Sequence, residues 1–142
     1  MKISDRLKWT LMGKSRKRKL DEFLELVNPN EDSKILDVGP ANKEFSPYDN
    51  YLEKHYPYGL SKISALSIQP LDLFKKRYDE IDVHIYEGGR FPFEDNAFDI
   101  VYSNAVIEHV GPYQKKLEFR LQGLRAKKRK SLATWKKLFT KG

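Results

Sequence analysis

The stretch Ile35–Phe45, with the sequence ILDVGPANKEF, joins a buried strand to a tight turn. Apolar residues flank Asp37, and Gly39 follows them at once, as at the end of a central strand where the backbone approaches a ligand closely. Nucleotide-binding turns usually carry two or three glycines, whereas here Pro40 and Ala41 follow a single one. We interpret the stretch as a degenerate ligand-binding loop rather than a plain turn.

Strands and helices are predicted to alternate on either side of this stretch. Short apolar runs predict strands over residues 34–38, 62–68, 82–86 and 98–103. Apolar residues at helical spacing predict helices over 15–27 and 47–56, with others starting near residue 70 and covering 105–110. Such alternation indicates right-handed crossovers and a parallel sheet. We therefore expect an α/β, Rossmann-like three-layer fold of about four strands, in the spatial order three-two-one-four.

Composition excludes several classes of protein. The 142 residues suffice for one domain with a core, and the absence of cysteine excludes disulfides and thiolate metal sites. The three histidines have no metal-ligand spacing, so we expect no metal. No apolar run approaches the ~20 residues of a membrane span, and the N-terminus lacks the apolar region of a signal peptide. We expect a soluble, cytoplasmic protein.

The net charge of +7 is unevenly distributed. Residues 1–112 hold 16 Lys and Arg against 19 acids, whereas residues 113–142 hold 11 against one. A second basic cluster spans residues 14–19. We divide the chain into an N-terminal basic segment (1–14), a central domain (15–112) and a basic tail (113–142). The basic ends favour an anionic partner such as nucleic acid or acidic lipid, and a merely solvated helix face remains an equal alternative.

The run FPFEDNAFDIVYSNAVIEHV, residues 91–110, resembles the third-to-fourth motif region of class I S-adenosylmethionine-dependent methyltransferases, closest to the type 11-like branch. Residues 34–39 and 62–68 resemble the first two motifs, in the same order and at the family's spacing, so that the resemblance covers about residues 16–116. It implies an enzyme that transfers a methyl group from S-adenosylmethionine to an acceptor that the sequence does not identify.

The resemblance also implies which residues bind the cofactor. They are Asp37, Gly39, Pro40 and Ala41 around the methionine part, Ser67 and Ile68 near the ribose, Gly88, Gly89 and Arg90 near the adenine, and Asn104 closing the pocket. Ser67 stands where the family has an acid, and the third loop also lacks its acid, which together cost roughly 1–3 kcal/mol of affinity. His109 is a weak candidate for a general base, and we favour a structural role for it.

Residues 113–142 depart from the family. They contain no Val or Ile, so they do not resemble a fifth buried strand, and apolar residues recur at helical spacing instead. We expect a long basic helix on which Leu117, Leu121, Leu124 and Trp135 face protein, and no effect on core stability when 113–142 are deleted. We favour a chain truncated or frameshifted near Tyr113 over a dedicated basic module. The strand at 98–103 would then keep a free edge that promotes self-association.

Two further functions stay open beside the methyltransferase reading. One is a non-catalytic nucleic-acid-binding protein that uses its basic termini on a Rossmann-like core, with an affinity that falls steeply with salt. The other is attachment of the tail helix to an anionic membrane surface.

Overall fold

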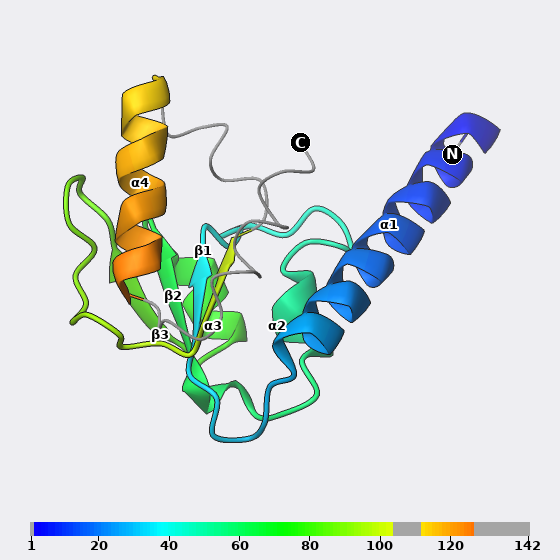
Figure 1. The fold of residues 1–142 in the computed structure, drawn as a ribbon. Coiled ribbons are helices and arrows are strands. Elements are labelled where there is room, and N and C mark those ends of the chain that lie inside the picture. The colour runs from blue at the N-terminus through cyan, green and yellow to red at the C-terminus, as the bar shows by residue number, and fades with distance from the viewer. Residues whose placement is uncertain (1, 104–111, 127–142) are drawn as a thin grey trace.

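The computed structural model of the chain describes residues 2–103 and 112–126 (Figure 1). Four strands form one parallel sheet in the spatial order β3-β2-β1-β4. They are β1 (Ile35–Val38), β2 (Ile63–Ser67), β3 (Asp82–Ile85) and β4 (Ile100–Ser103). Each strand lies within a predicted one, and the predicted order three-two-one-four is confirmed.

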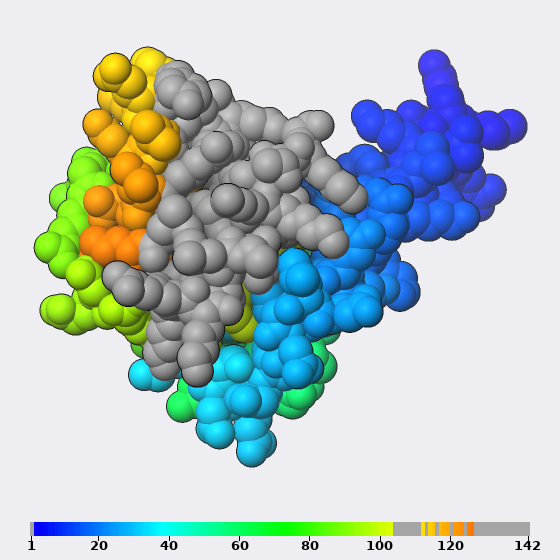
Figure 2. Space-filling model, viewed as in Figure 1, coloured from blue at the N-terminus to red at the C-terminus, as the bar shows by residue number. Residues whose placement is uncertain are grey.

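The helices differ from the predicted ones mainly at their N-terminal ends. They are α1 (Ile3–Val27), α2 (Tyr51–His55), the 3-10 turn η1 (Leu60–Lys62), α3 (Asp72–Arg77) and α4 (Tyr113–Ala126). The predicted start of α1 at Ser15 is wrong, so the boundary placed at residue 14 falls inside a continuous helix. The N-terminal end of α1 projects from the body, with Ile3 and Leu7 exposed, and therefore lacks the core-facing pattern on which the prediction relied (Figures 1 and 2).

Two asparagines set helix boundaries near the first strand. Asn28 ends α1 in the left-handed region with φ 44°, and its N–H donates to the Leu24 carbonyl at 2.9 Å. Asn50, with φ 48°, directly precedes α2, which is why that helix is shorter than the predicted 47–56. The helix predicted over 105–110 lies outside the described residues.

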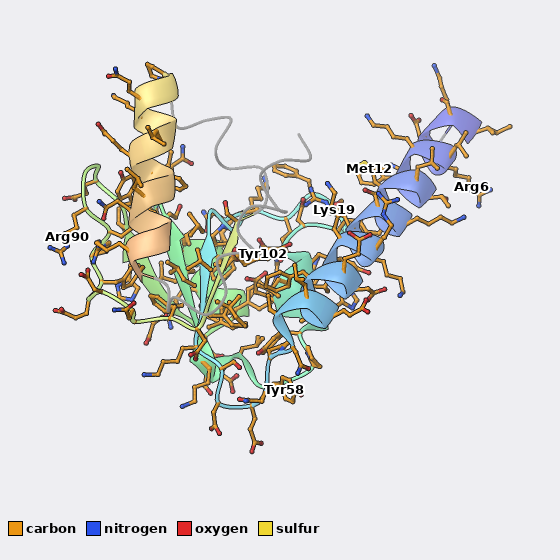
Figure 3. The ribbon with its side chains drawn as sticks, in the orientation of Figure 1. Arg6, Met12, Lys19, Tyr58, Arg90 and Tyr102 are labelled. Carbon is orange, nitrogen blue, oxygen red and sulfur yellow. The ribbon has the colours of Figure 1, made fainter. Side chains whose placement is uncertain are left out.

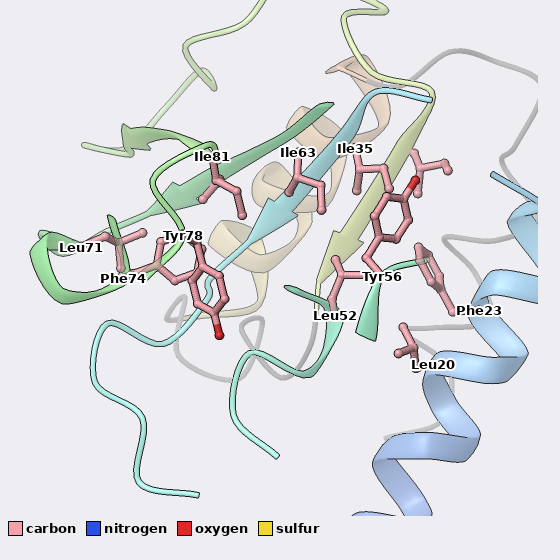
Figure 4. Packing of buried hydrophobic residues seen from close by; sticks show 12 residues of the cluster. Leu20, Phe23, Ile35, Leu52, Tyr56, Ile63, Leu71, Phe74, Tyr78 and Ile81 are labelled. Atoms are coloured by element: carbon pink, nitrogen blue, oxygen red, sulfur yellow. The ribbon is translucent and has the colours of Figure 1, made fainter. Parts of the chain in front are cut away.

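One face of the sheet packs against α1, α2 and α3 (Figure 4). Alternate strand residues Ile35, Ile63 and Ile100 point to this face and are almost fully buried. Phe23 of α1 and Leu52 of α2 cover them, at 2% and 1% exposure. This layer fixes the positions of α1 and α2 beside the end of β1.

The opposite face packs against α4 and the segment 91–98. Its core comprises Leu36, Val38, Leu66, Phe91, Phe98, Val101, Phe119 and Ala126. The Phe91 and Phe119 rings meet edge to face, with centroids 5.2 Å apart. Helices on both faces of a parallel sheet confirm the predicted three-layer, Rossmann-like α/β fold.

The first part of the basic tail belongs to this core. In α4, Phe119, Gly123 and Ala126 are buried at a helical spacing of four and three residues, whereas Leu117 and Leu121 are 45% and 53% exposed. The prediction that Leu117 and Leu121 face protein is therefore wrong, because the buried face of α4 lies two residues further along. The Leu124 side chain, Trp135 and the rest of residues 127–142 lie outside the described part of the chain.

Arg125 ties α4 to the segment that precedes β4. Its guanidinium donates to the carbonyls of Phe91 and Phe93, at 2.9 Å each, and pairs with Asp95. Its own carbonyl accepts the Asn96 N–H at 3.0 Å. These contacts contradict the expected independence of the tail from the core, as far as residues 113–126 are concerned.

Two findings concern the outer surfaces. Among the described residues, β4 pairs with β1 alone, so no strand covers its other edge. Within residues 2–103 and 112–126, no helix combines the length and apolarity that spanning a membrane requires.

Candidate functional site

The end of β1 places an acidic side chain between two neighbouring strands. Asp37 is in register with Ala65 of β2 and with Tyr102 of β4, so the three side chains share the face that carries α1 and α2. Asp37 is only 4% exposed. Ligands of open parallel sheets bind at the carboxyl ends of the strands, which is where Asp37 lies.

Gly39 turns the chain out of the strand. Its φ of 83° favours glycine, and its N–H donates to the Leu66 carbonyl at 2.8 Å. Asn50 then closes the loop, because its side-chain amide accepts the Ala41 N–H at 2.7 Å and donates to the Ala41 carbonyl at 2.8 Å. An asparagine side chain thus shapes this loop, in which Gly39 is followed by Pro40 and Ala41.

Glu44 fastens the same loop to two helices. Its carboxylate accepts hydrogen bonds from Asn50 at 3.0 Å and from the Tyr78 hydroxyl at 2.6 Å. It also pairs with Lys54 at 2.9 Å and with Arg77 at 2.8 Å. Burial alone would raise the pKa of Glu44, but these donors outweigh it and lower the pKa to about 2.

A pocket of about 120 Å³ opens above the end of β1. It is lined by Arg16 of α1, Asp37 and Tyr102 of the strands, Tyr51, Leu52 and Glu53 of α2, and Gly39, Pro40, Ala41, Tyr48, Asp49 and Asn50 of the loop. Figure 3 shows Tyr102 between the sheet and α1. The volume is below the ~300–1,000 Å³ of pockets that enclose whole small-molecule ligands, so this pocket suits one end of an extended ligand.

Two carboxyl groups meet at the base of this pocket. Asp37 and Glu53 are 4% and 5% exposed, and Glu53 Oε1 has no hydrogen-bond partner among the described residues. Burial raises the pKa of Asp37 well above its usual range, and the neighbouring Glu53 carboxyl raises it further. Burial, Asp37 and Glu53 likewise raise the pKa of Tyr102, against a smaller opposite effect of Arg16. The protonated form of Asp37 is therefore favoured beside the Glu53 carboxyl.

Aromatic rings form the wall of the pocket between α1 and α2. The Tyr48 ring stacks on Trp9 with centroids 6.2 Å apart, and lies 6.4 Å from Tyr51. Tyr51 in turn lies 4.1 Å from the His55 ring. Tyr48 also packs directly against Gly13, where a Cβ atom would come within 2.6 Å of the ring. The bare backbone of α1 at this position lets the tyrosine reach the pocket.

The structure brings only part of the predicted site together in one pocket. Asp37, Gly39, Pro40 and Ala41 line it, while Ser67 and Ile68, at the end of β2, do not. The Ser67 hydroxyl accepts the Gln69 N–H at 3.1 Å and is nearly buried, whereas Ile68 is 59% exposed.

The remaining predicted residues lie further away. Gly88 and Gly89 are exposed and have φ of 103° and 72°, with space around both Cα atoms. Arg90 points outward at the edge of the molecule, away from Tyr102, and pairs with Asp95 at 3.4 Å (Figure 3). Asn104 and His109 lie outside the described residues.

Sequence reasoning missed Glu53, Asn50, Arg16 and Tyr102. Two of these carried a signal: Glu53 is an acid beside the core-facing Leu52 on the helix predicted over 47–56, and Asn50 is a residue type that favours helix N-termini. Tyr102 and Arg16 carried none, because their places depend on strand register and on how α1 docks.

The sequence and the fold both match known methyltransferases. A family described as "Methyltransferase domain" matches residues 36–121, more than half of the chain. This match begins in β1 and ends inside α4. No curated protein sequence is detectably similar to the chain.

Several solved structures share the fold. A SAM-dependent methyltransferase from Aquifex aeolicus is 23% identical with a TM-score of 0.52, over 80% of this chain and 58% of its own. A protein from Methanococcus maripaludis, assigned as an S-adenosyl-L-methionine-dependent methyltransferase, is 16% identical with a TM-score of 0.58, over 88% and 56%. A protein from Galdieria sulphuraria, assigned as a sarcosine dimethylglycine methyltransferase, is 19% identical with a TM-score of 0.55, over 81% and 42%.

The chain thus spans about half the length of these structures. At identities this low, the likeness shows the fold, while the family match carries the assignment. The chain belongs to the methyltransferase-domain family, for which S-adenosylmethionine is the implied methyl donor.

Proposed function

We propose that this chain carries the donor-binding part of a methyltransferase, which transfers a methyl group from S-adenosylmethionine to an acceptor still to be identified. The observation that supports it is the pocket at the end of β1, where Asp37, Gly39 and Glu53 meet at the ligand-binding edge of the sheet. The family match begins within this strand, and the residues that line the pocket, apart from Arg16, fall within residues 36–121.

The residues present fit this donor. Its amino-acid end carries an ammonium group, and Glu53 Oε1 is a buried acceptor without a partner among the described residues. At Gly39 the backbone is free of a Cβ beside the pocket. In this proposal Asp37, Gly39, Pro40 and Ala41 hold the methionine part, Ser67 and Ile68 the ribose, and Gly88 and Gly89 the adenine. Arg90, engaged with Asp95 at the outer surface, is the weakest member of the predicted set.

Methyl transfer requires little proton transfer by the protein. S-adenosylmethionine supplies a methyl group that its sulfonium already activates. The chain's own residues then hold the donor in line with the acceptor, which accounts for much of the rate. We therefore assign positioning roles to the pocket residues, and we assign no general base.

The nucleic-acid-binding alternative gains no support from the part of the chain that the structure describes. In the basic cluster of α1, Lys17 and Arg18 pair with Asp21 and Glu22 one turn along the helix. These pairs reduce the charge that the cluster presents to a polyanion.

Calorimetric titration with S-adenosylhomocysteine tests the donor site. We expect Gly39→Val to abolish binding, because a branched side chain is strained at φ 83° and fills space beside the pocket. Gly59→Val is the matched control, since Gly59 has φ −63° and no atom within 4 Å of an added Cβ. Unchanged affinity in Gly39→Val would exclude this site.

Ser67→Asp tests the ribose assignment. A carboxylate at this position accepts charge-assisted hydrogen bonds from ribose hydroxyls, so the affinity for S-adenosylhomocysteine should rise by roughly 1–3 kcal/mol. Absence of any gain in a folded variant would contradict the assignment of Ser67 and Ile68 to the ribose.

A further inference from the structure

Glu53 is buried beside Asp37, and this acidic neighbour does not satisfy all of its hydrogen-bonding capacity. It lies in α2 at 5% exposure, and its Oε1 has no hydrogen-bond partner among the described residues. A buried carboxylate is strongly destabilising unless a cation or hydrogen-bond donors satisfy it, so such a group either keeps a proton or awaits a positive ligand. Glu53 and Asp37 line the same pocket, so a ligand bound there can supply the partner that Glu53 lacks.

No neighbouring side chain supplies the missing positive charge. Arg16 lines the pocket but forms no ion pair with another residue in the described ranges. Asp49 is occupied by the N–H groups of Phe45 and Ser46, at 2.7 and 3.0 Å. The remaining titratable groups lining the pocket are phenols, Tyr48, Tyr51 and Tyr102.

Tyr78, beyond the pocket, also lies within the electrostatic reach of Glu53. Burial and its hydrogen bond to Glu44 raise the pKa of Tyr78, and Glu53 adds a smaller effect. Its hydroxyl is already donated to Glu44 at 2.6 Å, so it leaves Glu53 unsatisfied.

We propose that Glu53 is a second acidic residue of the donor site, which shares one proton with Asp37 while the site is empty and releases that proton when the ammonium group of the donor's amino-acid end enters. The inference rests on the proposed function and deepens it. No covalent bond to carbon changes: one carboxylic acid gives its proton to solvent, and the ammonium keeps its own protons while it faces two carboxylates.

The proposal fixes the direction of the pH dependence. In the empty site, burial and the adjacent Glu53 raise the pKa of Asp37, whereas a bound cation lowers it. Since the bound state holds fewer protons, affinity rises with pH, by about tenfold per pH unit when one proton leaves per ligand. The rise ends once both carboxyls are ionised in the empty site.

Titration calorimetry in two buffers of different ionisation enthalpy measures the protons released. For the full chain we expect S-adenosylhomocysteine to release close to one proton, with an affinity that rises with pH. 5′-Methylthioadenosine, which lacks the amino-acid end, should bind without release. Glu53→Gln should bind S-adenosylhomocysteine with a smaller release and a shallower pH profile, because burial of Asp37 remains but its acidic neighbour is lost. The exposed Glu80→Gln should behave as the unaltered chain.

The outcomes separate this inference from the proposed function. Binding of S-adenosylhomocysteine by the unaltered chain without proton release, or with the same release as 5′-methylthioadenosine, would overturn the inference and leave the donor site intact. A folded Glu53→Gln that keeps the full pH dependence would overturn it as well. If S-adenosylhomocysteine does not bind at any pH, the proposed function fails and the inference with it. The comparison of S-adenosylhomocysteine with 5′-methylthioadenosine uses the unaltered chain, so it tests the inference even if Glu53→Gln does not fold.

Discussion

At the residue scale, Glu44 shows how a loop with a single glycine keeps its shape. Four donors from the loop, α2 and the neighbourhood of α3 converge on one carboxylate whose side chain is 10% exposed. Asn50 belongs to this group and also holds Ala41 through its side-chain amide. The geometry above β1 therefore depends on side-chain hydrogen bonds as well as on the turn at Gly39.

Glu44→Gln should destabilise the protein by about 1–3 kcal/mol near neutral pH, because the amide leaves Lys54 and Arg77 without their anion. The pKa of Glu44 is lowered from an ordinary 4.5 to about 2 in the folded state. Its stabilisation is therefore complete above the unfolded-state pKa and is lost as the pH falls from there towards about 2.

Urea denaturation at about pH 7 and about pH 2 measures this difference, with the exposed Glu80→Gln as control. The gap between Glu44→Gln and the unaltered chain should close at the acidic end. A gap that does not change with pH would show that the Glu44 contacts are not charge-dependent.

At the element scale, the contact between α1 and the loop before α2 sets the pocket wall. Tyr48 lies against Gly13, so the helix backbone and the ring touch without an intervening side chain. This contact holds α1 beside the pocket, although the N-terminal end of the helix projects from the body (Figure 1).

Gly13→Ala should therefore destabilise the fold. The new Cβ would lie 2.6 Å from the Tyr48 ring, an overpacking that costs about 1–3 kcal/mol, while alanine gains roughly 1 kcal/mol in helix propensity. We expect a net loss of up to about 2 kcal/mol in thermal or urea unfolding. Gly59→Ala, with free space around its Cα atom, should change the free energy of unfolding by no more than about 0.5 kcal/mol. A higher stability of Gly13→Ala than of the unaltered chain would show that the Tyr48 ring moves away from the new Cβ atom at little cost.

The buried face of α4 can be tested in the same way. Phe119, at 2% exposure, packs on Phe91, so Phe119→Ala should cost about 3–5 kcal/mol of unfolding free energy. Leu121→Ala, on the opposite face at 53% exposure, should stay within about 0.5 kcal/mol. Equal losses of unfolding free energy in the two variants would instead support the prediction from the sequence that Leu121 faces protein.

At the scale of the whole molecule, α4 forms the entire helical layer described on its face of the sheet. A chain ending at Pro112 loses the Phe119 packing and the Arg125 hydrogen bonds. Its thermal midpoint should fall by more than about 10 °C relative to a chain ending at Ala126, which keeps every described element. Equal midpoints would support the original expectation that the tail is independent of the core.

The sequence by itself determined the sheet. Strand positions, their parallel order and the ligand-binding edge follow from short apolar runs, their spacing and the handedness of crossovers, all of which are local or general properties of the chain. Asp37 and Gly39 were predicted for the same reason, since a strand end followed by glycine is visible in a few consecutive residues.

Only the tertiary structure decided what surrounds that edge. The pairing of Asp37 with Glu53, the convergence on Glu44 and the burial of Phe119 each join residues far apart in the chain. A local pattern can mark a single member, as it did for Asp37, but no local pattern shows which residues come together. Strand register and helix docking bring them together, because the side chains that share a face are fixed only when the layers pack.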